Sequence, residues 1–365
     1  MKNPANIIRA DILNTPAYQV QNATGLIKLD AMENPYPLPA AAQTALGAHL
    51  AQVALNRYPA AGNQSLRTKL KAAFAIPAQF ELVLGNGSDE LIHLIIQACA
   101  KPGACVLAPT PGFVMYAMSA QFNQVPFVGV PLNATDFSLD MPAMLAAIAR
   151  HQPAVIFLAY PNNPTGNCWP AEQIQQLIAA APGLVVIDEA YQPFAQTSWL
   201  PRLSDAANVV IIRTLSKLGL AGIRLGYLIA SPAWQQEIDK VRPPYNVNVL
   251  TQAAAEFILD HHLPALQQQA AILREQRTVL FAALSQMPGV TPFASQANFI
   301  LVRVPDAAAW LAALKTHGLL VKNVAAMQPQ LLANCLRLTI GTPAQTAQLI
   351  HALQAIIANQ EATPS

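Results

Sequence analysis

Seven short apolar runs, most of them separated by segments of helical character, constrain the fold of this chain more than any other feature of its sequence. Within each run the apolar residues are nearly continuous and do not alternate with polar ones. Such runs are typical of strands covered on both faces, as in a mainly parallel sheet. The predicted strands are Glu81–Gly85, Ala104–Ala108, Val125–Val130, Ala154–Ala159, Leu184–Asp188, Val209–Arg213 and Leu225–Ala230.

Three segments between these strands have the length of crossover helices, namely Leu91–Ala100, Met141–Arg150 and Ala171–Ala181. Strands that alternate with helices indicate an α/β fold. We therefore expect a doubly wound α/β domain with a mainly parallel seven-stranded sheet over residues 31–245.

The pattern changes after Pro243 and Pro244, and the remaining segments predict a smaller α+β domain over residues 246–365. Its first two helices are expected to be separated at Pro264. The expected elements are Val249–Asp260, Ala265–Gln286, Phe299–Val304, Ala307–His317, Leu319–Val324, Cys335–Ile340 and Pro343–Ala358. Residues 1–30 are expected to form an N-terminal arm that belongs to the small domain or to a dimer contact.

Composition narrows the class of protein. Of the 365 residues only 11% are charged, against about 25% in a typical globular domain, which suggests that another subunit covers part of the surface. Lys and Arg number 21 and Asp and Glu 19, without a basic block, so no nucleic-acid partner is expected. The uncharged stretch from Pro102 to Thr135 is interrupted by prolines and amides, and it lacks the ~20 continuous apolar residues of a membrane helix.

The four cysteines show neither a CxxC pair nor metal-ligand spacing, so we expect small core residues and no metal site. The segment from Met1 to Pro16 has no long apolar core and no small-residue cleavage site, so it is not expected to be a secretory signal. The predicted location is the cytoplasm.

In open α/β sheets, ligands bind beyond the carboxyl ends of the strands. The strand Glu81–Gly85 is followed by a glycine turn that opens a helix, with Gly87, Ser88 and Asp89, and such a turn suits a phosphate. An ordinary helix cap by Ser88 or Asp89 explains the pattern equally well. A dinucleotide fingerprint is excluded, because Glu90 occupies its third glycine position and no acidic residue follows about 20 positions later.

Two further strand ends carry polar groups. A rigid turn with two prolines and a glycine can hold the amide of Asn163 over a ligand, although spacing alone favours an ordinary turn. Asp188 ends a buried strand, where a carboxylate is costly without a partner. A protonated pyridine nitrogen is one such partner, and a salt bridge within the protein is the alternative.

The strand Val209–Arg213 leads into Thr214, Ser216 and Lys217, and Arg224 follows after two glycines. A lysine among hydroxyls and glycines at a strand end is poorly explained as a solvated surface residue. Desolvation makes such a lysine a nucleophile toward carbonyls, and an arginine fork suits phosphate. A lysine, an acid and a phosphate site at one sheet edge form the set that pyridoxal phosphate requires.

The motifs Asn163-Pro164-Thr165-Gly166, Asp188-Glu189-Ala190-Tyr191 and Ser216-Lys217 resemble those of fold-type-I, pyridoxal-phosphate-dependent class II aminotransferases, and in particular the histidinol-phosphate aminotransferases. The resemblance covers nearly the whole chain, from Asn34-Pro35-Tyr36 to Cys335–Gly341.

The resemblance implies that Lys217 carries the cofactor as a Schiff base and shuttles a proton, and that Asp188 pairs with the pyridinium nitrogen. It further implies that Asn163 and Tyr191 donate to the phenolic oxygen and that Phe113 stacks on the ring. The residues implied around the phosphate are Gly87, Ser88, Asp89, Thr214, Ser216 and Arg224.

A homodimer with shared active sites is also implied, in which Tyr58 reaches the phosphate of the partner subunit and Tyr18 crosses over to close the substrate pocket. Simple packing is the alternative for both tyrosines. Arg337 matches the arginine that binds the anionic end of the substrate, with Asn163 and Lys322 beside it. A surface ion pair is the alternative for Arg337.

Three positions depart from the family pattern. Lys217 and Arg224 are seven residues apart where many members have eight, so a tighter turn is expected. Lys322 stands where some members have an arginine, and a lysine binds phosphate less directionally. Phe113 replaces a frequent tyrosine, which keeps the stacking surface but loses a hydroxyl.

The implied reaction is transamination between L-histidinol phosphate with 2-oxoglutarate and imidazole-acetol phosphate with L-glutamate, in histidine biosynthesis. An aromatic amino-acid aminotransferase is the closest alternative, because its substrates also combine a flat ring with an anion. A decarboxylase of the same fold that acts on a phosphate substrate is a second one. A cofactor-binding regulator is disfavoured, because the first thirty residues contain no helix-turn-helix pattern.

Overall fold

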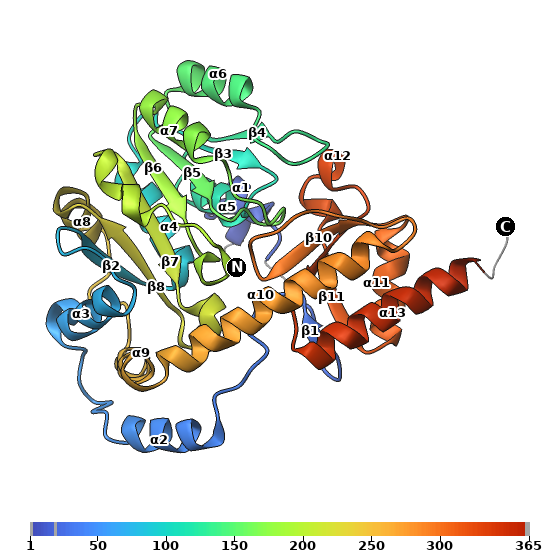
Figure 1. Ribbon diagram of the computed structural model, residues 1–365. Coiled ribbons are helices and arrows are strands. Elements are labelled where there is room, and N and C mark those ends of the chain that lie inside the picture. Colours follow the sequence, from blue (N-terminus) through green and yellow to red (C-terminus); the bar gives the residue numbers. More distant parts are fainter. Residues whose placement is uncertain (1–2, 18–19, 362–365) are drawn as a thin grey trace.

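The computed structural model describes residues 3–17 and 20–361 and contains two separate sheets (Figure 1). The larger sheet has seven strands in the order β2-β8-β7-β6-β5-β3-β4. Its strands are β2 (Glu81–Asn86), β3 (Val106–Thr110), β4 (Phe127–Pro131), β5 (Val155–Ala159), β6 (Leu184–Asp188), β7 (Val209–Thr214) and β8 (Leu225–Ala230). Only β8 runs antiparallel to its neighbours, so the predicted mainly parallel seven-stranded sheet is confirmed.

Successive residues of each central strand pack into different hydrophobic clusters, which is why the apolar runs are continuous. In β6, Val185 and Ile187 face one cluster, whereas Leu184 and Val186 face the other. The second cluster includes apolar residues of α4 and α5, and the first includes those of α6 and α7. Because both faces are covered by helices, neither can carry the polar residues that would produce an alternating pattern.

The helices of the chain fall within two residues of most predicted boundaries. They are α1 (Ala10–Leu13), α2 (Ala40–Leu50), α3 (Gln64–Ala73), α4 (Gly87–Cys99), α5 (Met115–Phe122), α6 (Met141–His151), α7 (Ala171–Ala180), α8 (Pro232–Asp239), α9 (Val249–His261), α10 (Leu263–Ser285), α11 (Ala307–Thr316), α12 (Pro329–Leu332) and α13 (Pro343–Glu361). Short helical turns are η1 (Pro4–Asn6), η2 (Ala61–Asn63), η3 (Gln192–Phe194), η4 (Leu200–Asp205), η5 (Ser216–Leu220), η6 (Ala221–Ile223) and η7 (Ala325–Met327).

The start of α4 differs from the expectation, because the helix begins at Gly87, at the glycine turn itself. The break between α9 and α10 also differs, since it lies at His262 and Pro264 belongs to the first turn of α10. Proline is tolerated there because the amide that it lacks has no intrahelical acceptor in the first turn.

The smaller sheet has the order β1-β11-β12-β10-β9. Its strands are β1 (Ile27–Leu29), β9 (Thr291–Pro292), β10 (Phe299–Arg303), β11 (Leu319–Asn323) and β12 (Cys335–Thr339). Its edge strand β1 comes from the N-terminal segment and pairs in parallel with β11.

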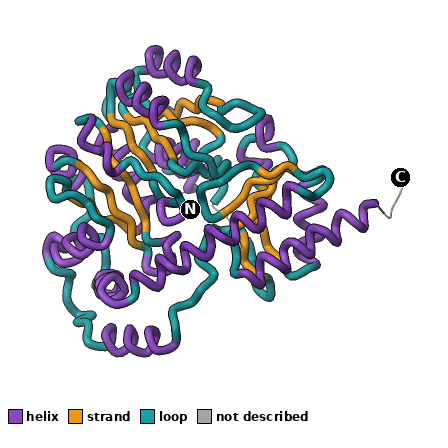
Figure 2. The backbone as a smooth tube through the Cα atoms, viewed as in Figure 1, coloured by secondary structure: helices purple, strands orange, loops and turns teal. Residues whose placement is uncertain are grey.

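The helix α10 connects the two units, as Figure 1 shows, and Figure 2 shows the two groups of strands on either side of the loops that meet between them. It packs against η3 and η5 of the larger unit and against α13 and β10 of the smaller one. The helix α9, which precedes it, packs against α2 and α3. No helix in the described part of the chain combines the length and the hydropathy needed to cross a bilayer.

Candidate active site

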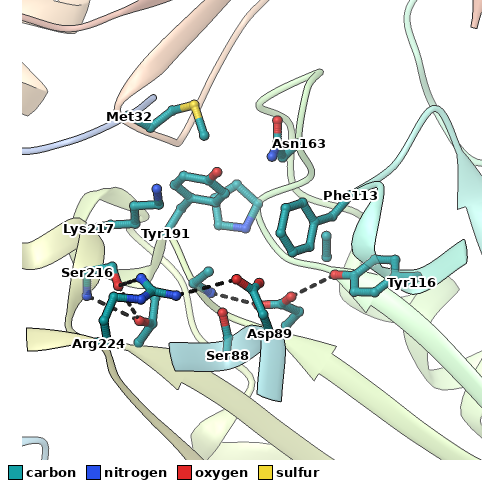
Figure 3. A pocket seen from close by; sticks show the side chains of 15 residues that line it. Met32, Ser88, Asp89, Phe113, Tyr116, Asn163, Tyr191, Ser216, Lys217 and Arg224 are labelled. Carbon is teal, nitrogen blue, oxygen red and sulfur yellow. Dashed lines mark hydrogen bonds and ion pairs between the residues drawn. The ribbon is translucent and has the colours of Figure 1, made fainter. Parts of the chain in front are cut away.

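A pocket lies at the carboxyl ends of β5, β6 and β7, where the loops after these strands meet the start of α4 (Figure 3). Most of the residues predicted for a cofactor site contribute to its wall. They are Ser88, Asp89, Phe113, Asn163, Asp188, Tyr191, Thr214, Ser216, Lys217 and Arg224. Residues far apart in the sequence are thus assembled around one space.

Lys217 lies in η5, a single π-helical turn directly after β7. Its Nζ donates a hydrogen bond to the carbonyl oxygen of Ala31 at 3.0 Å and lies 5.9 Å from the ring centroid of Tyr191. Burial, together with the positive charge of Arg337, lowers the pKa of the Lys217 amine to about 8. An amine with this pKa has a sizeable neutral fraction near neutral pH and is therefore a competent nucleophile.

Asp188 is the last residue of β6 and is buried. One carboxylate oxygen accepts a hydrogen bond from the Tyr116 hydroxyl at 2.7 Å, and the other accepts one from the Ala190 amide at 3.0 Å. Burial raises the pKa of Asp188 to about 6, an effect that these hydrogen bonds partly oppose.

The salt bridge considered as an alternative role for Asp188 is made by the next residue. Glu189 and Arg213 are both buried, and their charged groups approach to 2.8 Å. No cation of the described residues lies within ion-pair distance of Asp188, whose carboxylate belongs to the pocket instead.

The start of α4 and the side chain of Arg224 form an anion cradle. Gly87 has a φ of +78°, and a Cβ on it would lie 2.6 Å from Arg224 Nη2. Arg224 Nη1 donates to Ser216 Oγ at 3.4 Å, and Thr214 Oγ1 donates to the same oxygen at 2.9 Å. Backbone amides at a helix start, two hydroxyls and a guanidinium are suited to a phosphate group.

Asp89 lies on the same first turn of α4, 3.5 Å from Arg224 Nη2. Burial raises the pKa of its carboxyl, while the charges of Arg224 and Lys217 oppose that rise.

The turn between Lys217 and Arg224 is compact. The π-helical turn η5 passes directly into η6, and Arg224 closes the segment with a φ of +52°. Gly219 within it has a φ of +139°, and a Cβ there would lie 3.0 Å from Asn34 Nδ2. A glycine is required at this point because the backbone conformation and the close contact both exclude a side chain.

Arg337 lies on β12 in the smaller unit, is buried, and contacts Asn163 of the pocket wall. It donates to Asn163 Oδ1 at 2.5 Å and to the carbonyl oxygen of Asp30 at 2.8 Å. These contacts overturn the alternative of a surface ion pair. Lys322 pairs with Arg337 in the β11–β12 register, which places both side chains on one face of the sheet.

Four predicted residues that the structure describes are not part of the wall of this pocket, namely Gly87, Lys322, Arg337 and Tyr58. The side chain of Tyr58 is 79% exposed and stacks on Tyr245, with ring centroids 4.6 Å apart. Tyr18 lies outside the described residues.

Among the pocket residues that the sequence did not indicate are Tyr116 and Met32. Tyr116 stands within an apolar helix, where a tyrosine ordinarily indicates core packing. The sequence pattern therefore does not reveal the contact that its hydroxyl makes. Met32 follows β1 with a φ of +54°, and its backbone is held by Thr339 and Asn298 across the smaller sheet.

This donor set fits pyridoxal phosphate. The cradle has no room for a side chain at Gly87, the carboxylate of Asp188 has no cationic partner, and the buried Lys217 has a lowered pKa. Together they match the phosphate, the ring nitrogen and the aldehyde of that cofactor.

Comparison with known proteins agrees with this geometry. Residues 24–353 match the family model of aminotransferase class I and II. Histidinol-phosphate aminotransferase 2 of Burkholderia pseudomallei strain 1710b is 59% identical over 97% of this chain and 99% of its own length. Histidinol-phosphate aminotransferase 1 of Ralstonia nicotianae is 58% identical, with 96% of this chain and 94% of its own length covered.

Among solved structures, the histidinol-phosphate aminotransferase of Sinorhizobium meliloti in complex with pyridoxal-5'-phosphate superposes with a TM-score of 0.83 at 26% identity. The superposition covers 97% of this chain and 98% of that one. The chain therefore belongs to the class I and II aminotransferases, and among them to the histidinol-phosphate aminotransferases.

Proposed function

We propose that this chain is a pyridoxal-phosphate-dependent transaminase that interconverts L-histidinol phosphate plus 2-oxoglutarate and imidazole-acetol phosphate plus L-glutamate, in histidine biosynthesis. The observation that carries the chemistry is the placement of Lys217, Asp188 and the anion cradle around one buried pocket. The identity of the substrate is inferred from relatives that are 58–59% identical over nearly the whole chain and are named histidinol-phosphate aminotransferases.

Different residues of the pocket would hold different parts of the cofactor. The start of α4, with Ser88 and Asp89, would hold the phosphate together with Thr214, Ser216 and Arg224. Asp188 would hold the ring nitrogen, Asn163 and Tyr191 the phenolic oxygen, and Phe113 one face of the ring. When bound, the cofactor supplies an electron sink for the electron pair left at the substrate α-carbon.

Lys217 is the residue that moves the proton. Its Nζ would take up the proton from the substrate α-carbon, hold it, and deliver it on the far side of the substrate nitrogen. The lowered pKa of Lys217 supports this role, because a general base works best when its pKa is close to the operating pH.

The anionic end of the substrate is assigned to Arg337, with Asn163 and Lys322 beside it. Arg337 is held by Asn163 and by the backbone of Asp30, so its fork is fixed in direction before the substrate arrives. Its charge is also close enough to Lys217 to lower that pKa, which places the anion site next to the reacting atoms.

We further propose a homodimer in which Tyr58 serves the phosphate site of the partner subunit. Tyr58 and Tyr245 stack on the surface, and Leu55 in the same loop is 70% exposed. Exposed aromatic and aliphatic side chains of this kind are typical of surfaces that another chain covers. Unpaired cysteines, at Cys99, Cys105, Cys168 and Cys335, are compatible with the proposed cytoplasmic location.

A panel of single turnovers tests the proposed substrate. We expect histidinol phosphate to lose its amino group fastest and 2-oxoglutarate to accept it. Phenylalanine would be the better donor if the enzyme served aromatic amino acids. Release of carbon dioxide from threonine phosphate would instead identify a decarboxylase.

A further inference from the structure

Tyr116 lies on the opposite side of the pocket from Lys217 in Figure 3, and its hydroxyl contacts the carboxylate of Asp188. It belongs to α5 and is 2% exposed, with its ring stacked on Phe157 at 4.5 Å and in edge contact with Phe113 at 5.7 Å. Its position is therefore fixed by packing on both sides, and only the hydroxyl is free to make a polar contact.

That hydroxyl donates to the carboxylate of Asp188. Burial raises the pKa of Tyr116 well above its usual value, and the nearby charge of Asp188 raises it further, so the phenol keeps its proton. A carboxylate that accepts from a neutral donor at 2.7 Å forms a charge-assisted hydrogen bond, and this bond favours the ionised form of the acid.

The other charges around Asp188 do not provide this stabilisation. Asp89 on α4 is an acid, and its charge disfavours a second anion nearby. Glu189 is also an acid and is already paired with Arg213. The Ala190 amide donates to Oδ1, so the Tyr116 hydroxyl is the one side-chain donor to this carboxylate among the described residues.

We propose that Tyr116 is a positioning residue that keeps Asp188 ionised, so that the proton between this carboxylate and the ring nitrogen of the bound cofactor rests on the nitrogen. The inference rests on the proposed function, in which Asp188 faces that nitrogen. A proton on the nitrogen gives the ring the positive charge that makes it an effective electron sink.

Burial works against the ionised form of Asp188, since it raises the pKa of this carboxyl to about 6, and the Tyr116 hydroxyl opposes that rise. Loss of a hydrogen bond to a charged group shifts a pKa by about 1 to 2 units. A further rise of that size favours the proton on the carboxyl, and so favours a neutral carboxyl beside a neutral ring nitrogen.

The test uses holoenzyme loaded with pyridoxal phosphate that carries ¹⁵N in the ring, and nuclear magnetic resonance reads the protonation of that nitrogen. Tyr116→Phe keeps the stacking on Phe157 and removes only the hydroxyl. Tyr160→Phe is the matched control, since it removes a hydroxyl that bonds Thr197 at 3.1 Å and keeps the backbone hydrogen bond from Tyr160 to the carbonyl oxygen of Asp188.

We expect the ring nitrogen of the Tyr116→Phe holoenzyme to shift toward the unprotonated position, whereas the Tyr160→Phe signal stays at that of the unaltered enzyme. We also expect kcat to fall about tenfold with little change in KM, because ring charge matters most in the transition state. If Tyr116 had a purely structural role, its loss would not shift the nitrogen signal, and it would not lower kcat while leaving KM nearly unchanged.

The outcomes separate this inference from the proposed function. A protonated nitrogen that is unchanged in Tyr116→Phe but lost in Asp188→Ala overturns the role of Tyr116 alone. A nitrogen signal that is unchanged in Asp188→Ala overturns the assignment of Asp188, and with it the proposed arrangement of the cofactor.

Discussion

At the scale of single residues, burial shifts two pKa values in opposite directions. The same desolvation lowers the pKa of the Lys217 amine to about 8 and raises that of the Asp188 carboxyl to about 6. Removal from water disfavours the charged form of either group, and for a base and an acid that effect has opposite signs. Burial in one pocket thus brings the pKa values of both groups toward neutral pH, where each group can exchange a proton.

Replacing the amine should eliminate the reaction. We expect Lys217→Ala to lower the rate of amino transfer by at least about 100-fold, because the general base is lost, and to remove the visible absorbance that depends on the covalent link. Spectra and single turnovers of the purified variant check both effects. Lys322→Ala, which removes a different amine on β11, should keep the absorbance. An active Lys217→Ala enzyme would refute the assignment.

At the scale of elements, the start of α4 and the loop after β7 work as one unit. Gly87 opens the helix where the guanidinium of Arg224 lies against it. On its other side, Gly226 of β8 packs so closely that a Cβ there would lie 2.5 Å from the carbonyl carbon of Gly87. The cradle therefore depends on two glycines that allow a helix start, a strand and an arginine to meet.

A methyl group in the cradle should weaken cofactor binding. In Gly87→Ala the new Cβ collides with Arg224 and occupies a positive φ, so we expect the cofactor dissociation constant to rise by about tenfold or more, about 1.4 kcal/mol. Equilibrium titration with pyridoxal phosphate measures it. The control is Gly222→Ala, since a Cβ at Gly222 meets no atom within 4 Å. Equal losses in the two variants would contradict a specific role for the cradle.

At the scale of the whole molecule, the pocket depends on contacts between its two units. Arg337 from the smaller unit bonds Asn163 of the larger one, and Lys217 bonds the backbone of Ala31 in the segment that follows β1. The N-terminal segment joins the smaller sheet through β1, at the edge next to β11 (Figure 1).

Mixed subunits test whether the site also extends across a dimer. If Tyr58 acts in the partner subunit, each hybrid of a Tyr58→Ala chain and a Lys217→Ala chain contains one intact site. Random mixing makes half of the dimers hybrids, so we expect about a quarter of the original activity from two nearly inactive parents. Activity after mixing under subunit exchange is the measurement. Absence of recovery would mean that Tyr58 acts within its own chain.

The sequence by itself determined the larger sheet and most of the polar residues that line the pocket. Apolar runs that must be covered on both faces specify parallel strands, and Lys217, Asp188 and Asn163 follow such strands at positions that must meet at one edge. This part can be predicted from sequence because it depends on the local pattern of apolar residues and on the rule that the carboxyl ends of parallel strands lie at one edge of a sheet.

Only the tertiary structure decided which side chains complete the pocket. The Tyr116–Asp188, Arg337–Asn163 and Lys217–Ala31 hydrogen bonds join residues 72, 174 and 186 positions apart. A tyrosine within an apolar helix has the same sequence signature whether its hydroxyl meets water, a carbonyl or a carboxylate. The partner is selected when the helix packs on the sheet, because only then do the direction of the side chain and its distance to the acid become fixed.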